Sequence, residues 1–203
     1  MGVSGIVLAG GRSTRMGKDK TLMAYQNETM IERVVRGLRN VADEIIIASN
    51  STAKYGIPGT VEVPDLYLNM GPLGGIHAGL TAASHPRSFV VAADMPLFSP
   101  GLAQFLLTQG LDCDVVVPEL DGYLEPLCAV YTKNCLVAIN DCLRTNIRQI
   151  IKFYPRVRVH RIPGESLARF GCTDELFYNM NTPEDYQQLF ERLNGAAPVK
   201  KPS

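Results

Sequence analysis

Four short runs of consecutive apolar residues constrain the fold of this 203-residue chain more than any other feature. In these runs the apolar residues follow one another directly, whereas a strand with one side in water would alternate them with polar residues. Such runs indicate strands that are buried on both faces, as in the middle of a parallel sheet. The four runs lie within residues 5–9, 44–48, 88–93 and 114–117.

Helix signals separate these predicted strands. Thr29 followed three residues later by Glu32 forms a capping-box pattern and predicts the start of a helix. Small and apolar residues at helical spacing predict a second helix over residues 72–83, and Ser99 followed by Pro100 is typical of the start of a third. The alternation predicts an α/β fold: a single three-layer α/β/α sandwich around a mostly parallel, twisted, Rossmann-like sheet.

The second half of the chain has a looser pattern. The pair Asp121-Gly122 is a turn signal and predicts a hairpin-like departure from the parallel sheet. No long linker divides the chain, so we expect one domain over residues 1–194 and a flexible tail over residues 195–203. The further elements expected are helices at 133–143 and 146–154, strands at 157–162 and 176–180, and a last helix that begins near Thr182.

Composition excludes several classes of function. Lys and Arg together number 20, as do Asp and Glu, so the net charge is zero and excludes nucleic-acid binding through bulk positive charge. No strictly apolar run exceeds five residues, whereas a membrane helix needs roughly 20. The five cysteines form no Cys-x-x-Cys pair, and the N-terminus shows no secretory signal. We therefore expect a cytoplasmic protein that does not bind membranes.

The segment that follows the first predicted strand carries the sharpest functional signal. From Leu8 to Lys20 it reads LAGGRSTRMGKDK, with three glycines and four cations against the single acid Asp19. Glycines let backbone N–H groups approach a ligand closely, and cations offset phosphate charge. Because open α/β sheets bind ligands at the carboxyl ends of their strands, this loop is predicted to bind phosphates.

Two common phosphate-binding motifs do not match this loop. A P-loop begins with glycine and continues with Ser or Thr after its lysine, but here Arg12 takes the glycine position and Asp19 follows Lys18. The dinucleotide pattern GxGxxG also fails. The chain is therefore predicted to be neither a P-loop NTPase nor a Rossmann dehydrogenase.

Three polar residues follow other predicted strands. Asp94 comes after the most apolar strand, so its carboxylate is expected at the same sheet edge as the glycine loop. Mg²⁺ binds one or two carboxylates together with substrate phosphate oxygens, which makes Asp94 the best candidate for a metal ligand, with capping of the next turn as the alternative. Asp65 and Asn50 are placed similarly, and for them capping and a plain turn role remain open.

Several motifs together resemble those of the molybdenum cofactor guanylyltransferases. These are nucleotidyltransferases with a Rossmann-like fold of the glycosyltransferase-A type, and their signature LAGGxSxRMGxDK matches Leu8 to Lys20 without a gap. The resemblance extends over residues 6–193. It includes VPD at 63–65, GPLGGI at 71–76, AADMP at 92–96 and NMNTPED at 179–185.

The resemblance implies an activity and a set of site residues. The implied reaction transfers GMP from GTP to the phosphate of Mo-molybdopterin, with Mg²⁺, and yields molybdopterin guanine dinucleotide and pyrophosphate. Gly10 favours guanine because related cytidylyltransferases carry Ala there, and protein partners in molybdenum cofactor biosynthesis are also implied. The implied nucleotide-binding residues are Leu8, Ala9, Gly10, Lys20, Asn50, Asp65 and Asp94. The implied catalytic residues are Arg15, Lys20 and Asp94, of which Asp94 also binds the metal.

Other interpretations stay open. A nucleotidyltransferase of the same fold could use CTP or a sugar phosphate, and a non-catalytic carrier could bind molybdopterin or nucleotide without releasing pyrophosphate. His77 is expected to pack or cap, with a general-base role as the alternative. Glu125 precedes Pro126 on what the resemblance makes the acceptor side, and its role is open.

A basic run at i, i+4 spacing follows later in the chain. The spacing predicts that these residues share one helical face. This face is either exposed to solvent or binds a phosphorylated substrate. The run consists of Arg144, Arg148, Lys152 and Arg156.

Overall fold

The computed structural model describes residues 2–10, 22, 24–25, 28–50, 53–171, 176–178 and 185. The strands are β1 (Val3–Leu8), β2 (Ala24–Tyr25), β3 (Glu28–Thr29), β4 (Glu44–Ser49), β5 (Val61–Pro64), β6 (Arg87–Ala92), β7 (Val115–Leu120), β8 (Tyr123–Leu124), β9 (Cys128–Thr132) and β10 (Val159–Pro163). The α-helices are α1 (Met30–Leu38), α2 (Pro72–Ala82), α3 (Pro100–Thr108) and α4 (Cys135–Arg144). The 3₁₀ helices are η2 (Ile150–Arg156), η3 (Gly164–Ser166) and η4 (Ala168–Phe170).

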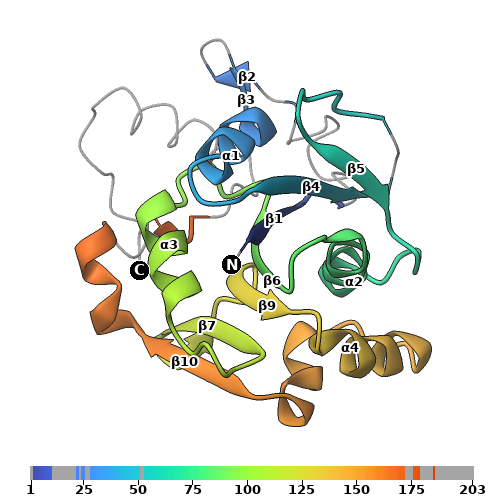
Figure 1. Cartoon of the computed structure of the whole chain (residues 1–203), viewed down its shortest axis with the longest axis vertical. Helices are drawn as coiled ribbons and strands as arrows, with labels where there is room; N and C mark the ends of the chain where they lie inside the picture. Colours follow the sequence, from blue (N-terminus) through green and yellow to red (C-terminus); the bar gives the residue numbers. More distant parts are fainter. Residues whose placement is uncertain are drawn as a thin grey trace.

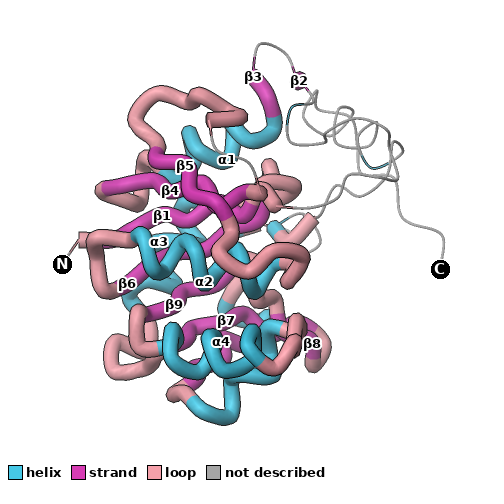
Figure 2. The backbone as a smooth tube through the Cα atoms, turned by 90° about the vertical axis from the view of Figure 1, so that its right-hand side faces the viewer, coloured by secondary structure: helices cyan, strands magenta, loops and turns pink. Residues whose placement is uncertain are grey.

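One large sheet organises the molecule (Figure 2). Its strand order is β10-β7-β9-β6-β1-β4-β5, and β8 pairs with β7 beside this path. The neighbouring strands β6, β1, β4 and β5 all run parallel, whereas β9 runs antiparallel between β6 and β7. The prediction of a mostly parallel sheet is therefore confirmed, and β9 and the short β8 are the strands that run in the opposite direction.

Helices cover both faces of this sheet. Figure 1 shows α1 and α3 on one face and α2 and α4 on the other. Val7 of β1 belongs to a buried cluster that includes Leu102 of α3, and its neighbour Ile6 belongs to a second cluster with Ile76 of α2 and Ile139 of α4. Because successive side chains of a strand point to opposite faces, these two clusters confirm the predicted three layers.

The helix starts predicted from local sequence are confirmed. The Glu32 N–H donates to the Thr29 hydroxyl at 3.3 Å, and the Thr29 N–H donates to the Glu32 carboxylate at 2.6 Å. At α3, the Leu102 N–H donates to the Ser99 hydroxyl at 3.4 Å. Each bond satisfies a backbone donor that the first helical turn leaves without an intrahelical partner.

The helix expected over residues 146–154 is only partly confirmed, because a 3₁₀ helix begins at Ile150 and no α-helix forms. The preceding helix α4 ends at Arg144, and Asn146 adopts a φ of +60°, a left-handed conformation in which an α-helix cannot continue. The chain then forms the 3₁₀ helix η2, so the four basic residues at i, i+4 spacing do not share one helical face. Arg156 pairs instead with Asp141 of α4 at 2.6 Å.

The hairpin at Asp121-Gly122 is confirmed, because both residues have positive φ and connect β7 to β8. The strand expected over 176–180 is not seen at its described residues, 176–178. The helix near Thr182 and the tail over 195–203 fall outside the residues that the structure describes.

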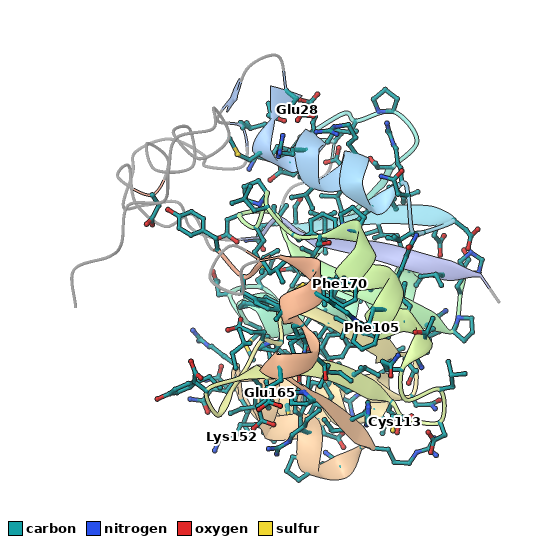
Figure 3. The ribbon with its side chains drawn as sticks, turned by 90° about the vertical axis from the view of Figure 1, so that its left-hand side faces the viewer. Glu28, Phe105, Cys113, Lys152, Glu165 and Phe170 are labelled. Carbon is teal, nitrogen blue, oxygen red and sulfur yellow. The ribbon has the colours of Figure 1, made fainter. Side chains whose placement is uncertain are left out.

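The chain beyond β10 returns to the α3 face. Figure 3 shows Phe105 of α3 beside Phe170 of η4, and their ring centroids lie 5.2 Å apart. Arg169 stacks on the Phe105 ring at 4.3 Å, which adds a cation–π contact to this packing. Of the helices in the described ranges, none is long and apolar enough to cross a membrane.

Close packing of α2 on β1 leads to a first prediction. A Cβ added at Gly79 would lie 2.5 Å from Cγ2 of Ile6, which is fully buried and cannot yield. We expect Gly79→Ala to lower the free energy of unfolding by about 1–3 kcal/mol, despite the better helix propensity of alanine. Urea denaturation measures this loss. The matched control is Gly101→Ala in α3, where the nearest atoms to the added Cβ are 3.5 Å away and stability should not fall.

Candidate functional site

The predicted site residues of the described chain meet at one edge of the sheet. We call the edge at which the parallel strands β6, β1, β4 and β5 end the carboxyl edge. Leu8 ends β1, Ala9 and Gly10 follow it, and Asn50 and Asp65 come directly after β4 and β5. Asp94 follows the end of β6 by two residues. Parallel pairing therefore brings together residues that are up to 86 positions apart in the sequence.

Backbone hydrogen bonds hold this edge beyond the ends of the strands. The Ala9 N–H donates to the Ala48 carbonyl at 2.8 Å, and the Ala93 N–H donates to the Leu8 carbonyl at 3.0 Å. On the β5 side, the Asp65 N–H donates to the Ser49 carbonyl at 3.2 Å. At Ala9, Ala93 and Asp65, the sheet ladder thus continues past the strand ends and fixes the backbone of the site.

Gly10, Asn50 and Asp65 form a compact group. A Cβ added at Gly10 would lie 3.5 Å from Oδ2 of Asp65 and 3.9 Å from Nδ2 of Asn50. Two more glycines, Gly74 and Gly75, face Asp65 from the first turn of α2, where added Cβ atoms would lie 3.7 Å from its carboxylate oxygens. Three glycines, Gly10, Gly74 and Gly75, therefore surround the Asp65 carboxyl group closely.

The carboxyl group of Asp65 is buried and incompletely hydrogen-bonded within the described residues. Asp65 is 8% exposed, and burial raises the pKa of its carboxyl group. Within the described part of the chain, its Oδ1 atom has no hydrogen-bond partner. A buried acceptor without a partner is unfavourable, and a hydrogen-bond donor on a ligand would relieve it.

Asp94 lies where the glycine loop leaves the sheet. It is partly exposed, in a turn where the Met95 N–H donates to the Ala92 carbonyl at 3.1 Å. Asp94 lies at the carboxyl edge, and its backbone neighbour Ala93 bonds directly to Leu8. A carboxylate is the kind of hard oxygen donor that Mg²⁺ prefers. Among the described residues, no group of three or more His, Cys, Asp or Glu side chains could hold a metal ion.

Two predicted site residues cannot be placed. Arg15 and Lys20 lie outside the residues that the structure describes, as do residues 11–21 as a whole. Gly10 is the last described residue of the glycine loop, so the loop starts at the carboxyl edge beside Asp65.

Tyr55, which no sequence motif marks, contacts the backbone of the site. The Tyr55 hydroxyl donates to the Ala9 carbonyl at 3.3 Å, directly before Gly10. The loop that carries Tyr55 is held by Glu62, whose carboxylate accepts the N–H groups of Lys54 and Gly56, both at 2.8 Å. No motif marks a tyrosine in an irregular loop, so no sequence signal was available for it.

His77 takes a packing position. Its ring lies in an edge-to-face contact with Tyr67, with centroids 5.3 Å apart, and burial lowers its pKa. The Tyr67 hydroxyl in turn donates to Asn140 of α4. His77 therefore helps to join α2 to the loop after β5 and to α4, which favours its packing role.

Comparisons with known proteins decide the family. Residues 5–159 match the model of the MobA-like NTP transferase domain. The chain belongs to this family. A "probable molybdenum cofactor guanylyltransferase" of Pelotomaculum thermopropionicum is 43% identical over 183 residues, which cover 90% of this chain and 89% of that protein. The molybdenum cofactor guanylyltransferase of Desulfosudis oleivorans is 36% identical over 92% of this chain and 93% of its own length.

A solved structure agrees with this membership in the MobA-like family. The crystal structure of molybdopterin-guanine dinucleotide biosynthesis protein A from Archaeoglobus fulgidus superposes with a TM-score of 0.81 at 27% identity. The match covers 94% of this chain and 98% of that one. As a MobA-like nucleotidyltransferase, the chain is an enzyme, and its family typically uses a divalent metal.

Proposed function

We propose that this enzyme transfers GMP from GTP to the phosphate of Mo-molybdopterin, forming molybdopterin guanine dinucleotide and pyrophosphate. The names of its relatives support this reaction. The structural observation that carries the proposal is the meeting of Gly10, Asn50 and Asp65 beside the strand that leads to Asp94. Protein partners in molybdenum cofactor biosynthesis belong to the same proposal.

The nucleotide occupies the part of the carboxyl edge between β1 and β5 in this proposal. Gly10 offers its backbone to the base and ribose, because a glycine there leaves the space that a side chain would fill. The Leu8 and Ala9 carbonyls each accept one hydrogen bond within the protein and offer their second lone pair to the nucleotide. Asp65 accepts a hydrogen bond from the nucleotide at its unpartnered Oδ1 atom. Asn50 provides an amide beside it.

The triphosphate extends from there toward Asp94. Arg15 and Lys20 neutralise its charge, in keeping with the four cations of their loop. Asp94 would hold Mg²⁺ together with phosphate oxygens of the substrates, and the ion would offset their negative charge when bound. The nucleophile is already an anionic phosphate, so the protein needs no general base; it must align two anions and stabilise the departing pyrophosphate.

A nucleotide panel tests the proposed function. With Mo-molybdopterin and Mg²⁺, the enzyme should release pyrophosphate from GTP much faster than from CTP, ATP or UTP. Preference for CTP, or turnover with a sugar phosphate, would favour another nucleotidyltransferase of this fold. Nucleotide binding without pyrophosphate release would favour a carrier.

Gly10 offers a sharper version of this test. Its added Cβ would meet Asp65 and Asn50 at ordinary contact distances, so Gly10→Ala should leave the free energy of unfolding unchanged. The methyl group would instead occupy space that we assign to guanine, and kcat/KM for GTP should fall by about 10- to 200-fold, the range for one carbon in a binding pocket. Initial rates with GTP and with CTP measure the effect; equal losses with both nucleotides would contradict the assignment.

A further inference from the structure

Glu125 occupies the carboxyl edge on the side of Asp94 opposite to the nucleotide residues. It lies in the connection from β8 to β9, and β9 starts where its antiparallel neighbour β6 ends, because Cys128 pairs with Val91. The Ala92 N–H donates to the Leu127 carbonyl at 3.0 Å. Gly10, Asn50 and Asp65 follow β1, β4 and β5, so β6 and Asp94 stand between the two groups.

Several hydrogen bonds fix the backbone around Glu125. The Glu125 N–H donates to the Pro118 carbonyl at 2.9 Å, and its own carbonyl accepts from the Cys128 N–H at 3.1 Å. From beneath, the fully buried Tyr131 donates its hydroxyl to the Pro126 carbonyl at 2.7 Å. Tyr131 is itself 3.0 Å from the hydroxyl of Tyr154 in η2. These hydrogen bonds make the backbone of the turn rigid. A rigid backbone is what orients a binding side chain precisely.

Within the described ranges, the Glu125 carboxyl group has no partner of its own. Glu125 is partly buried, and burial raises the pKa of its carboxyl group. Among the described residues, no hydrogen bond or ion pair reaches its carboxyl oxygens. The nearby Glu119 of β7 differs, because it pairs with Arg161 of β10 at 3.3 Å. A partly buried carboxyl group without a protein partner is suited to accept hydrogen bonds from a ligand.

The charge of Glu125 limits what it can bind. The acceptor's phosphate is an anion, and a carboxylate would repel it. Glu125 must therefore face a part of the acceptor that donates hydrogen bonds. The pterin ring offers such a part: its 2-amino group and the adjacent ring N–H are two parallel donors, which match the two oxygens of one carboxyl group as a guanidinium does.

We propose that Glu125 sets acceptor specificity by accepting hydrogen bonds from the 2-amino and ring N–H groups of the pterin. This inference rests on the proposed function for the identity of the acceptor. The phosphate of the acceptor then points toward Asp94, where it meets the nucleotide, while the pterin is held at the β9 side of the carboxyl edge. In this proposal, the enzyme binds GTP on one side of β6 and the pterin of the acceptor on the other side.

Two small molecules test the contact without turnover. Pterin carries the 2-amino group, and lumazine is the same ring system with oxygen in its place. By fluorescence or calorimetric titration, the wild-type protein should bind pterin at least about tenfold more tightly than lumazine, the discrimination expected for a charge-assisted hydrogen bond. Glu125→Gln and Glu125→Ala should remove this preference and leave GTP binding unchanged.

Turnover and a matched variant complete the experiment. In the full reaction, Glu125→Gln should raise KM for Mo-molybdopterin by about 10- to 100-fold with KM for GTP unchanged. The control is Asp121→Asn at the exposed tip of the same hairpin, where asparagine tolerates the positive φ and neither KM should move. Thermal unfolding verifies that the variants fold.

The outcomes separate this inference from the proposed function. Wild-type protein that binds pterin and lumazine equally, or binds neither, overturns the role of Glu125, as does an unchanged KM for the acceptor in Glu125→Gln. Loss of GTP binding in the same variant also overturns it. A Glu125-dependent preference for pterin, found together with no pyrophosphate release from GTP, supports the role of Glu125 and contradicts the proposed guanylyl transfer.

Discussion

Asp94→Ala is expected to abolish Mg²⁺-dependent guanylyl transfer, with a loss in kcat/KM of at least about 1,000-fold. Asp94 lies two residues beyond the end of β6, between Gly10, Asn50 and Asp65 on one side and Glu125 on the other. We propose that the two anionic phosphates approach each other at this point. Loss of the Asp94 carboxylate removes the ligand that we assign to the cation at that point. Pyrophosphate release over a range of Mg²⁺ concentrations measures the effect.

The fold should survive this change. Asp94 is partly exposed and lies in a turn outside the sheet, so the free energy of unfolding should change by no more than about 1 kcal/mol. Asp112→Ala serves as a control, because this exposed aspartate precedes β7 at the opposite edge of the sheet and should leave turnover unchanged. Full turnover in Asp94→Ala would contradict the assignment of Asp94, and so would a collapse of stability in that variant.

Features of the fold that depend on local chemistry could be predicted from the sequence. The apolar runs that become β1, β4, β6 and β7 are buried because no polar residue interrupts them. The capping box at Thr29 and the turn at Asp121 act over three or four residues, so their sequence pattern is sufficient. The positions of Asp65 and Asp94 at one edge follow from the same reasoning, since parallel strands end together.

Features that depend on contacts distant in sequence could not be predicted. The i, i+4 spacing of Arg144 and Arg148 indicates a helix, but Asn146 takes a left-handed conformation between them and ends α4. The antiparallel direction of β9 is a property of the assembled sheet, and it alone places Glu125 at the carboxyl edge. The close surroundings of Asp65 likewise form only when α2 brings Gly74 and Gly75 against it.

The burial of Asp65 gives the last prediction, in which stability rises and GTP affinity falls. Burial raises the pKa of Asp65 in the folded protein above its value in the unfolded chain. The folded state therefore holds this proton more tightly, and the free energy of unfolding falls as pH rises from the unfolded pKa through the folded pKa. Above that window the ligand-free protein carries the full cost of a buried charge.

Asp65→Asn removes that charge while keeping the shape of the side chain. At pH 7 the ligand-free variant should be more stable than the wild type by about 1 kcal/mol, as is common when a group required for function is replaced. The difference should shrink as pH falls and the wild-type carboxyl becomes protonated. Denaturant titrations between pH 4 and pH 7 measure both effects. GTP affinity should meanwhile fall by about 10- to 150-fold, the value of hydrogen bonds to a charged acceptor. A variant that is less stable at pH 7 and binds GTP normally would show that Asp65 serves the fold and not the nucleotide.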